Sequence, residues 1–274
     1  STTILNYKNF TMSNTESLTG KIALITGASR GIGAAIARAL GSSGFEISGT
    51  APTNGGVLQI SASLKQNAIE GQGMLLDIAD PESISNLKSM MADLNSQPSV
   101  IINNAGITKD SLLIRMKHDE WNDVITANLL GAQQICKIFL RDMIKRRWGR
   151  IINISSVSAK QPIDNLMLSN GVRMSIHGWA KTLSNQVASD NILINNVCPG
   201  FTHTERVDGL IKAQVENSNS SREDIIESIA SDIPAKRVGQ AQELAALVTF
   251  LSSEKASYIT CLLYTSPSPR DRTR

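Results

Sequence analysis

A glycine-rich run carries residue types that suit phosphate binding: Thr26, Gly27, Ala28, Ser29, Arg30, Gly31, Ile32 and Gly33. Gly31 and Gly33 lack a Cβ, so a pyrophosphate can approach the main chain and a following helix can pack close to the preceding strand. A helix that begins here turns its free N–H groups and the positive end of its dipole toward that phosphate. The same spacing also suits a strand–helix turn whose glycines serve packing alone.

Other short motifs and single residues stand out beside or between the apolar runs. They are Asn103, Asn104, Ala105 and Gly106 after one run, Ser156 after another, the pair Pro199 and Gly200, and Asn128 inside a long amphipathic stretch. Asn103 and Asn104 also suit hydrogen bonding between neighbouring loops. The three histidines, His118, His177 and His203, lack the spacing of metal ligands, and we interpret them as surface or lid residues.

The elements that position these residues alternate between strands and helices. Strands are predicted at 21–25, 45–50, 73–76, 100–102, 150–154 and 192–197, and helices at 34–40, 57–69, from 80 onward, 119–147 and 164–188. This rhythm predicts a single α/β domain with a Rossmann-type, doubly wound parallel sheet. Residues 202–232 are polar and partly helical, an insertion at the place where such folds carry a substrate lid.

Composition narrows the class of protein. The chain has 274 residues, 41% of them hydrophobic, enough for one large core. Its formal net charge of +3 comes from scattered residues, so neither nucleic acid nor membrane is expected as a partner. The three cysteines show no paired spacing, and no apolar stretch reaches membrane-spanning length. A cytoplasmic protein without a metal site is expected.

Both ends of the chain differ from the middle in composition. Residues 1–17 are predicted to be a non-native or disordered extension, with Met12 as a natural start, and residues 262–274 a non-native tail. The folded domain is then 18–261, and its sheet is expected to lack its native last strand and to leave an unprotected edge.

The glycine run, Asn103 to Gly106, Asn128, Ser156 and Pro199-Gly200 together resemble the classical short-chain dehydrogenases/reductases. The run Asn103 to Asp123 is most similar to the 3-oxoacyl-[acyl-carrier-protein] reductases of fatty-acid synthesis. The resemblance covers about 18–261 and rests on several spaced motifs, which makes it more specific than the glycine run alone.

The cofactor expected from the sequence is NADP(H). NAD sites usually have a carboxylate at the end of the second strand, whereas this chain has Gly49, Thr50, Ala51, Pro52 and Thr53 there. The resemblance assigns the Arg30 position to the 2′-phosphate, with Thr50 or Thr53 substituting for a threonine that aligns with Pro52. Arg30 also suits a solvated loop charge.

The resemblance further implies that Asp77 and Ile78 flank the adenine, that Asn104, Ala105 and Gly106 line the cofactor, and that Thr204 meets the nicotinamide end. Asp77 and Thr204 equally suit capping of the following turn and helix.

The resemblance implies ketone reduction by hydride transfer with a Ser, Tyr, Lys and Asn set. Ser156 and Asn128 match the serine and the asparagine, but Ser169 and Arg173 stand where the family has tyrosine and lysine. An aliphatic hydroxyl is far less acidic than a phenol, and arginine has no accessible proton to shuttle. Arg173 can still orient the cofactor ribose, and Ser169 also suits a plain helix position kept for packing.

Two functions follow from this set. One is an NADPH-dependent reductase of a 3-oxoacyl thioester or similar ketone, and the other is a nucleotide-binding sensor or partner subunit with lost or reduced catalysis. Arg147 falls at a position that the resemblance links to carrier-protein docking, but Asp190 reverses the charge at the second one. A helix end also attracts such cations through its dipole. The resemblance implies a homo-oligomer, a homotetramer in the family, paired through the helices at 119–147 and 164–188.

Overall fold

The computed structural model describes residues 18, 20–218 and 220–265. Its main sheet has the order β3-β2-β1-β4-β5-β6-β9, with every neighbouring pair parallel. The strands are β1 (Ile22–Ile25), β2 (Glu46–Ala51), β3 (Gly71–Leu75), β4 (Val100–Asn103), β5 (Gly149–Ile154), β6 (Ile192–Cys198) and β9 (Leu263–Thr265). This doubly wound parallel sheet confirms the predicted fold class.

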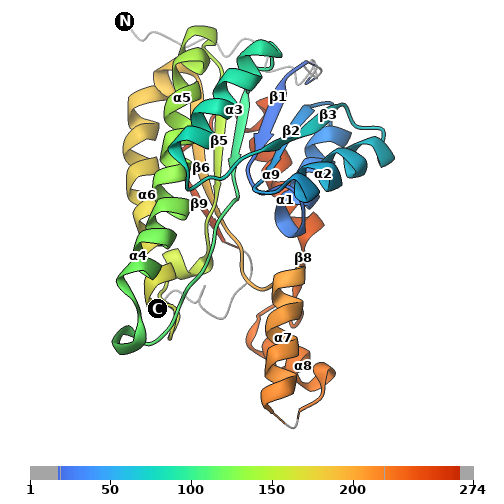
Figure 1. Cartoon of the computed structure of the whole chain (residues 1–274), viewed down its shortest axis with the longest axis vertical. Coiled ribbons are helices and arrows are strands. Elements are labelled where there is room, and N and C mark those ends of the chain that lie inside the picture. Colours follow the sequence, from blue (N-terminus) through green and yellow to red (C-terminus); the bar gives the residue numbers. More distant parts are fainter. Residues whose placement is uncertain (1–17, 19, 219, 266–274) are drawn as a thin grey trace, which may run out of the picture.

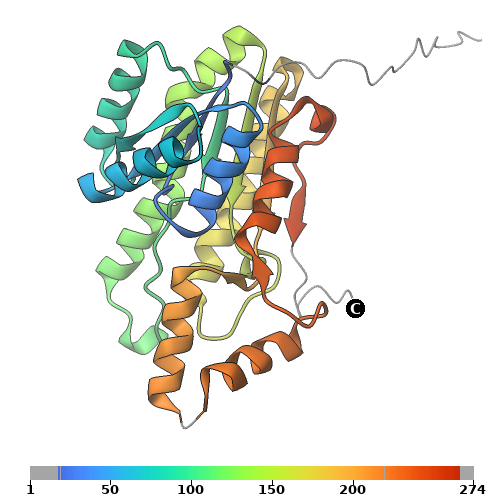
Figure 2. The same ribbon diagram turned by 90° about the vertical axis from the view of Figure 1, so that its right-hand side faces the viewer.

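Helices cover both faces of the sheet (Figure 1). Their bounds are α1 (Gly31–Ser42), α2 (Asn54–Gln66), α3 (Pro81–Asp93), α4 (His118–Ile125), α5 (Gly131–Arg146), α6 (Met167–Val187), α7 (Glu205–Asn217), α8 (Arg222–Asp232) and α9 (Ala241–Leu251). Short helical turns lie at η1 (Leu113–Arg115), η3 (Val157–Ala159), η4 (Ala188–Asp190) and η5 (Glu254–Ala256). The view in Figure 2 shows α7 and α8 projecting from the body as a separate arm.

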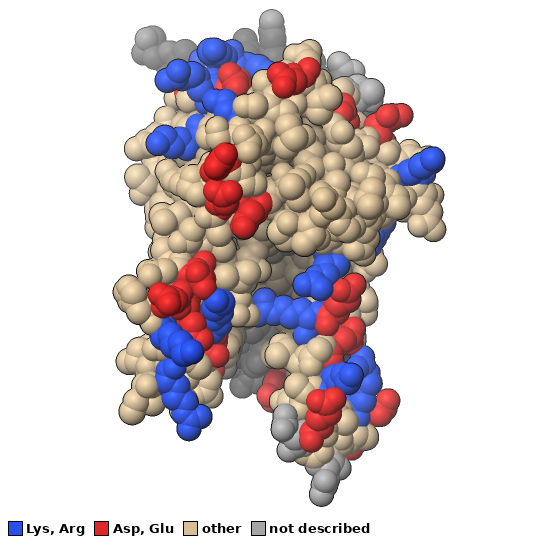
Figure 3. All heavy atoms as spheres, in the orientation of Figure 1, with Lys and Arg blue, Asp and Glu red and all other residues tan. Residues whose placement is uncertain are grey.

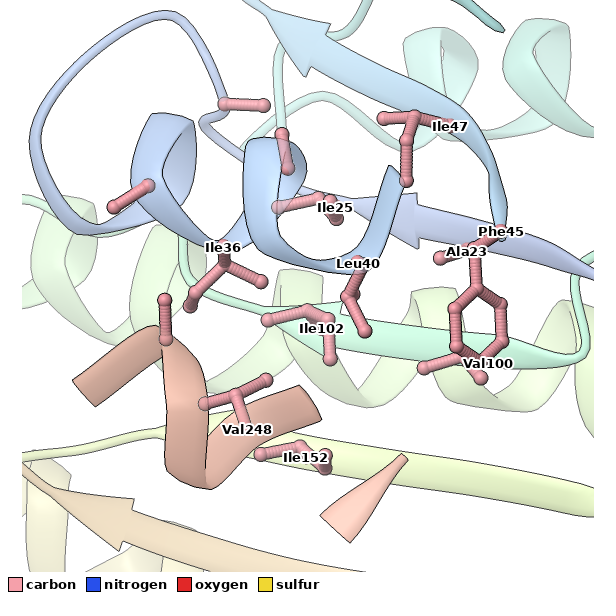
Figure 4. Packing of buried hydrophobic residues seen from close by; sticks show 14 of the residues in the cluster. Ala23, Ile25, Ile36, Leu40, Phe45, Ile47, Val100, Ile102, Ile152 and Val248 are labelled. Atoms are coloured by element: carbon pink, nitrogen blue, oxygen red, sulfur yellow. The ribbon is translucent and has the colours of Figure 1, made fainter. Parts of the chain in front are cut away.

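The strand residues alternate between two hydrophobic cores because successive side chains of a strand point to opposite faces. In β1, Ala23 and Ile25 join the core under α1 and α9, whereas Ile22 and Leu24 join the core on the other face, with α3 and α5. Figure 4 shows Ile36 and Leu40 of α1 and Val248 of α9 packed over Ile25, Ile102 and Ile152 of the sheet. Because helices pack on both faces, the parallel strands are fixed in place and their carboxyl ends lie along one edge of the sheet.

The helix predicted at 119–147 is interrupted in the structure. A π-helical segment, η2 (Thr126–Leu130), separates α4 from α5, and it contains the predicted site residue Asn128. Such single-turn insertions are frequent at functional sites. The insertion predicted at 202–232 forms the strand β7 (Thr202–His203) and the helices α7 and α8, and β7 pairs with β8 (Gly239–Gln240).

The expectation that the sheet leaves an unprotected edge is wrong, because a further strand pairs with β6. Residues from the segment expected to lie outside the domain supply β9, in which Tyr264 is the register partner of Val197 in β6. Main-chain bonds extend the contact, since Cys261 N donates to Ile194 O at 2.7 Å and Asn196 N donates to Leu262 O at 3.1 Å. A parallel ladder uses peptide groups that any sequence offers, so composition did not reveal it. The foreign origin of 262–274 stays a prediction, and the extension 1–17 lies outside the described residues.

Candidate functional site

A cavity of about 770 Å³ opens at the carboxyl ends of the strands, between β1 and β4. This is the switch point of the sheet, where open α/β folds bind ligands. Figure 3 shows the recess between the main body and α7, with Lys and Arg side chains across its mouth. The predicted site residues that line the cavity are Gly27, Ser29, Arg30, Gly31, Ile32, Gly33, Thr50, Asp77, Ile78, Asn104, Ala105, Gly106, Arg173, Pro199 and Thr204.

The other predicted residues lie beside the cavity rather than in its described lining. Ala28 is a buried member of the glycine turn, and Gly200 directly follows Pro199 of the lining. Thr53 and Ser156 accept hydrogen bonds from nearby main-chain N–H groups, whereas Asn128 and Ser169 bond to partners far away in the sequence.

The glycine turn serves packing and leaves a helix end open. A Cβ on Gly33 would lie 2.2 Å from the Gly27 carbonyl oxygen and 2.5 Å from Asn104 Nδ2, so close packing alone requires glycine there. Gly31 has a φ of +56° and also needs glycine. The N-cap residue of α1, Arg30, makes no capping hydrogen bond with its side chain. The start of α1 therefore faces the cavity uncapped, which fits a bound pyrophosphate.

Asn104 fixes this turn to the end of β4. Its Nδ2 donates to the carbonyl oxygens of Thr26 and Gly27, each at 2.9 Å. In return, Thr26 Oγ1 accepts from the main-chain N–H groups of Asn104 and Ala105, each at 3.0 Å. The loop-to-loop role considered for Asn104 is thus present, and the residue lines the cavity as well.

The end of β2 presents the Thr50 hydroxyl rather than a carboxylate to the cavity. Thr50 lines it and accepts a long hydrogen bond of 3.4 Å from Gly27 N. Thr53 is instead the N-cap of α2, accepting from Gly56 N at 3.2 Å. Arg30 is exposed and lies 3.6 Å from Glu205 of α7. Arg30 is therefore part of an exposed ion pair at the cavity, and water weakens such a pair.

Two residues predicted to touch the cofactor also cap local structure. Asp77 Oδ1 accepts from Ala79 N at 2.9 Å, and Thr204 Oγ1 accepts from Val207 N at 3.4 Å as the N-cap of α7. Both residues line the cavity. The capping and binding interpretations are compatible at both positions.

Asn128 is buried in the π-helical segment and is held at both ends of its amide. Its Oδ1 accepts from Ile107 N and its Nδ2 donates to Ile107 O, each at 2.8 Å. Ser156 follows β5, and its Oγ accepts from Ser158 N at 3.1 Å. The acceptor role leaves the Ser156 hydroxyl hydrogen available for another partner.

Ser169 is engaged by a carboxylate that sequence reasoning missed. Its main-chain N–H donates to Asp110 Oδ1 at 2.9 Å, and its hydroxyl donates to Asp110 Oδ2. Asp110 lies in the loop after β4, 59 residues away in sequence, and no local pattern marks it. Ser169 is consequently held at the start of α6 and turned to Asp110.

Arg173 is the cation of the inner cavity. Its Nη1 donates to Ile154 O at 3.0 Å, and a Cβ on Gly106 would lie 3.2 Å from its Nη2. Burial, together with the charge of nearby Arg206, lowers the pKa of Arg173 to about 10. Arg206, also missed from the sequence, lines the cavity from α7 and donates to Thr108 Oγ1 at 2.7 Å.

The prediction that His177 is a surface or lid residue is wrong. It lies on α6 one turn after Arg173, and its Nε2 is 3.0 Å from Ser155 Oγ and 3.6 Å from Cys198 Sγ. Ser155, rather than its neighbour Ser156, belongs to the described lining of the cavity. The four-residue spacing from Arg173 on one helix face was the available signal for His177.

The described part of the chain lacks two further features. No cluster of three or more His, Cys, Asp or Glu residues is arranged to hold a metal ion there. None of the described helices combines the length and apolar character needed to cross a membrane.

Known proteins resemble both the sequence and the fold. The family model for short chain dehydrogenases matches residues 21–214. The chain is 41% identical over 244 residues to the 3-oxoacyl-[acyl-carrier-protein] reductase of Pseudomonas aeruginosa, covering 89% of this chain and 94% of that protein. The Escherichia coli reductase of the same name is 40% identical over 241 residues, covering 88% and 93%.

Solved structures agree with this similarity. L-sorbose reductase from Gluconobacter frateurii, complexed with NADPH and L-sorbose, has a TM-score of 0.89 at 25% identity, covering 93% of this chain and 98% of that one. An actinorhodin polyketide ketoreductase with NADPH has a TM-score of 0.87 at 27% identity, covering 92% and 98%. With its glycine turn, its switch-point cavity and these relatives, the chain belongs to the short-chain dehydrogenase family.

Proposed function

We propose that this protein is an NADPH-dependent ketone reductase whose substrate is a 3-oxoacyl thioester or a similar carbonyl compound. The observation that carries the proposal is one continuous cavity that joins the open start of α1 and Arg30 to Arg173 and Ser155. Relatives named as 3-oxoacyl-[acyl-carrier-protein] reductases support the substrate class, and neighbours with bound NADPH support the cofactor.

The cavity residues divide the binding of NADP(H) between them. The α1 N-terminus takes the pyrophosphate, and Arg30 with Thr50 takes the 2′-phosphate, where the end of β2 offers no carboxylate to repel it. Arg173 donates to the nicotinamide ribose through its planar fork, and Asn104, Ala105 and Gly106 line the cofactor between these ends. Thr53 caps α2 and supports the phosphate end indirectly.

When bound, NADPH supplies the hydride that reduces the ketone carbon. Ser156 polarises the carbonyl oxygen through its hydroxyl hydrogen, a contact that grows stronger as negative charge develops on that oxygen. Asn128 holds the loop after β4 through Ile107, which fixes one wall of the site. Arg173 cannot serve as the proton donor, because its guanidinium stays charged at neutral pH.

Delivery of the substrate by a carrier protein is not supported by the surface charges. Arg147 is paired with Asp190 at 3.3 Å and donates to Ser189 O at 2.9 Å. The arginine that a docking partner would engage is thus already satisfied within the chain. We therefore propose a free thioester or small ketone as the substrate.

We also propose a homo-oligomer that pairs through α5 and α6. A groove of about 470 Å³ between these helices is lined by Leu140, Trp179 and Leu183, an apolar surface that a second copy can cover. Light scattering coupled to size exclusion tests this, and a monomer at micromolar concentration rejects it.

A second function, nucleotide binding with lost catalysis, is favoured by one observation. The Ser169 hydroxyl is committed to Asp110, so the position where the family has a proton donor has none to give. A chain of this kind retains NADPH binding and shows no turnover.

One experiment separates the two functions and tests the cofactor. NADPH and NADH are titrated against the protein by fluorescence, and NADPH oxidation is then followed with a panel of 3-oxoacyl thioesters and ketones. We expect Arg30→Ala to weaken NADPH binding by about 10- to 100-fold, the scale of a lost charged hydrogen bond, and to leave NADH binding unchanged.

Arg222→Ala is the matched control. Like Arg30→Ala, it removes the cation of an exposed ion pair, in this case the pair between Arg222 of α8 and Asp208 of α7. Binding without turnover would leave the second function in place. Equal affinity of wild type and Arg30→Ala for NADPH would reject the assigned 2′-phosphate site.

A further inference from the structure

Reduction of a ketone needs a proton as well as a hydride, and the residues at the family's positions do not supply it. Ser169 donates its hydroxyl hydrogen to Asp110, and Arg173 remains a cation with a pKa of about 10. Tyr258 is fully exposed at the C-terminal edge, away from the cavity lining. Ser156 is already assigned to polarising the carbonyl, so the proton of the proposed reaction calls for a further group that lines the cavity.

Ser155 and His177 form the hydroxyl–imidazole pair that meets this need. Ser155 is 7% exposed, lines the cavity, and is fixed by its main-chain N–H, which donates to Val197 O at 2.7 Å. Its Oγ lies 3.0 Å from Nε2 of half-buried His177. When a serine lies between a ligand cavity and a histidine, the imidazole can give a proton to the serine oxygen or accept one from its hydroxyl.

We propose that Ser155 donates the proton to the substrate oxygen and that His177 is the positioning residue that reprotonates Ser155. This inference rests on the proposed reductase function and deepens it. The carbonyl carbon accepts the hydride, the Ser155 O–H bond breaks as the alcohol O–H bond forms, and the His177 Nε2 proton moves to Ser155 Oγ. Ketone, NADPH and one proton become alcohol and NADP⁺, and neutral His177 then regains a proton from water.

The groups around His177 set the direction of its pH dependence. On its own helix Arg173 adds positive charge, and burial acts in the same sense, so both lower the pKa of His177, burial more strongly. From β6, the Cys198 thiol lies 3.6 Å from Nε2, and from β5 the neutral Ser155 faces it. Arg206 and Asp110 act on Arg173 from the α7 and β4 sides. A larger fraction of His177 is therefore protonated as the pH falls below neutrality. Because protonated His177 supplies the proton to Ser155, reduction becomes faster at lower pH.

The test is the pH profile of kcat for NADPH-dependent reduction by the full-length protein and by His177→Gln. Glutamine keeps a nitrogen that can hydrogen-bond Ser155, but it cannot carry a proton that titrates. We expect the acid-side rise of kcat to vanish and kcat at pH 5.5 to fall by about 10²-fold or more, the lower range for loss of a general acid. NADPH affinity should stay within about twofold, because His177 is outside the cavity lining.

His118→Gln is the matched control, since His118 is exposed at the start of α4 and should keep the wild-type profile. Should His177→Gln fail to fold, Ser155→Ala provides the same comparison, with the same loss of the acid-side rise expected.

An unchanged profile in a folded, NADPH-binding His177→Gln protein overturns the relay alone. Wild-type protein that binds NADPH but reduces no ketone in the panel overturns both the relay and the catalytic part of the proposed function. Wild-type turnover without an acid-side rise also overturns the relay.

Discussion

At the scale of single residues, Ser169, which replaces the family's tyrosine, has a structural role at the start of α6. Ser169 is used by Asp110 to hold the start of α6, and the N-cap residue of that helix, Leu166, makes no side-chain capping bond. Asp110 thus acts as a cap supplied by another loop, with its negative charge at the positive end of the helix dipole. One carboxylate fixes the helix that carries both Arg173 and His177.

Removing this cap should destabilise the protein. Asp110→Ala is expected to lower the free energy of unfolding by about 1–2 kcal/mol, the usual cost of a lost N-cap. Urea unfolding followed by far-UV circular dichroism measures the change. Asp164→Ala removes an exposed carboxylate shortly before α6 and serves as the control. Equal losses in both variants would contradict the capping role.

The buried environment of His177 links proton binding to stability. Its folded-state pKa lies below the ordinary value of 6.5, so below pH 6.5 the unfolded chain binds more protons than the folded one. This contribution makes the wild type lose stability as the pH falls from 6.5 toward the folded-state pKa. Unfolding free energies measured from pH 7.5 to 5 should fall less steeply for His177→Gln than for wild type. Parallel curves would show that His177 does not titrate differently in the two states.

At the scale of elements, the site depends on two irregular segments. The π-helical turn places Asn128 where its amide bonds both main-chain groups of Ile107, and the glycine turn leaves the start of α1 open. A regular helix would place the Asn128 amide elsewhere, and a side-chain cap on α1 would occupy the main-chain N–H groups that face the cavity. The site therefore requires departures from ideal geometry inside otherwise regular elements.

The glycine turn gives a sharp prediction about packing. Gly33→Ala should destabilise the protein by more than about 1 kcal/mol and weaken NADPH binding, because the new Cβ meets main-chain oxygen at 2.2 Å. Gly171 of α6 has nothing within 4 Å of an added Cβ, so Gly171→Ala should instead stabilise the protein by about 0.4–1 kcal/mol. Thermal and urea unfolding with and without NADPH compare the two variants. A Gly33→Ala protein as stable as wild type would refute the packing requirement.

At the scale of the whole molecule, β9 protects the edge of the sheet that β6 would otherwise expose. The strand is short, yet Tyr264 also packs against the core beside α9. An uncovered β6 would present unpaired main-chain groups to other chains. Leu263–Thr265 thus form part of the main sheet.

Two truncations test this role of β9. A chain ending at Cys261 should unfold at a lower temperature than the full chain and should aggregate more readily, because β6 becomes an edge strand. A chain ending at Thr265 keeps the strand and should match the full-length protein. Differential scanning calorimetry and light scattering give both readouts. Equal behaviour of the two truncations would mean that β9 adds no stability.

The sequence by itself determined the parallel sheet and the glycine turn, because apolar periodicity and glycine spacing act over a few consecutive residues. The other predicted residues that line the cavity came from the resemblance to the short-chain dehydrogenases/reductases. Only the tertiary structure decided that Asp110 engages Ser169, that His177 reaches Ser155, and that β9 completes the sheet. These contacts join residues 59, 22 and about 67 positions apart, between side chains or peptide groups that carry no local pattern. Which distant groups meet is set by how the helices pack on the sheet.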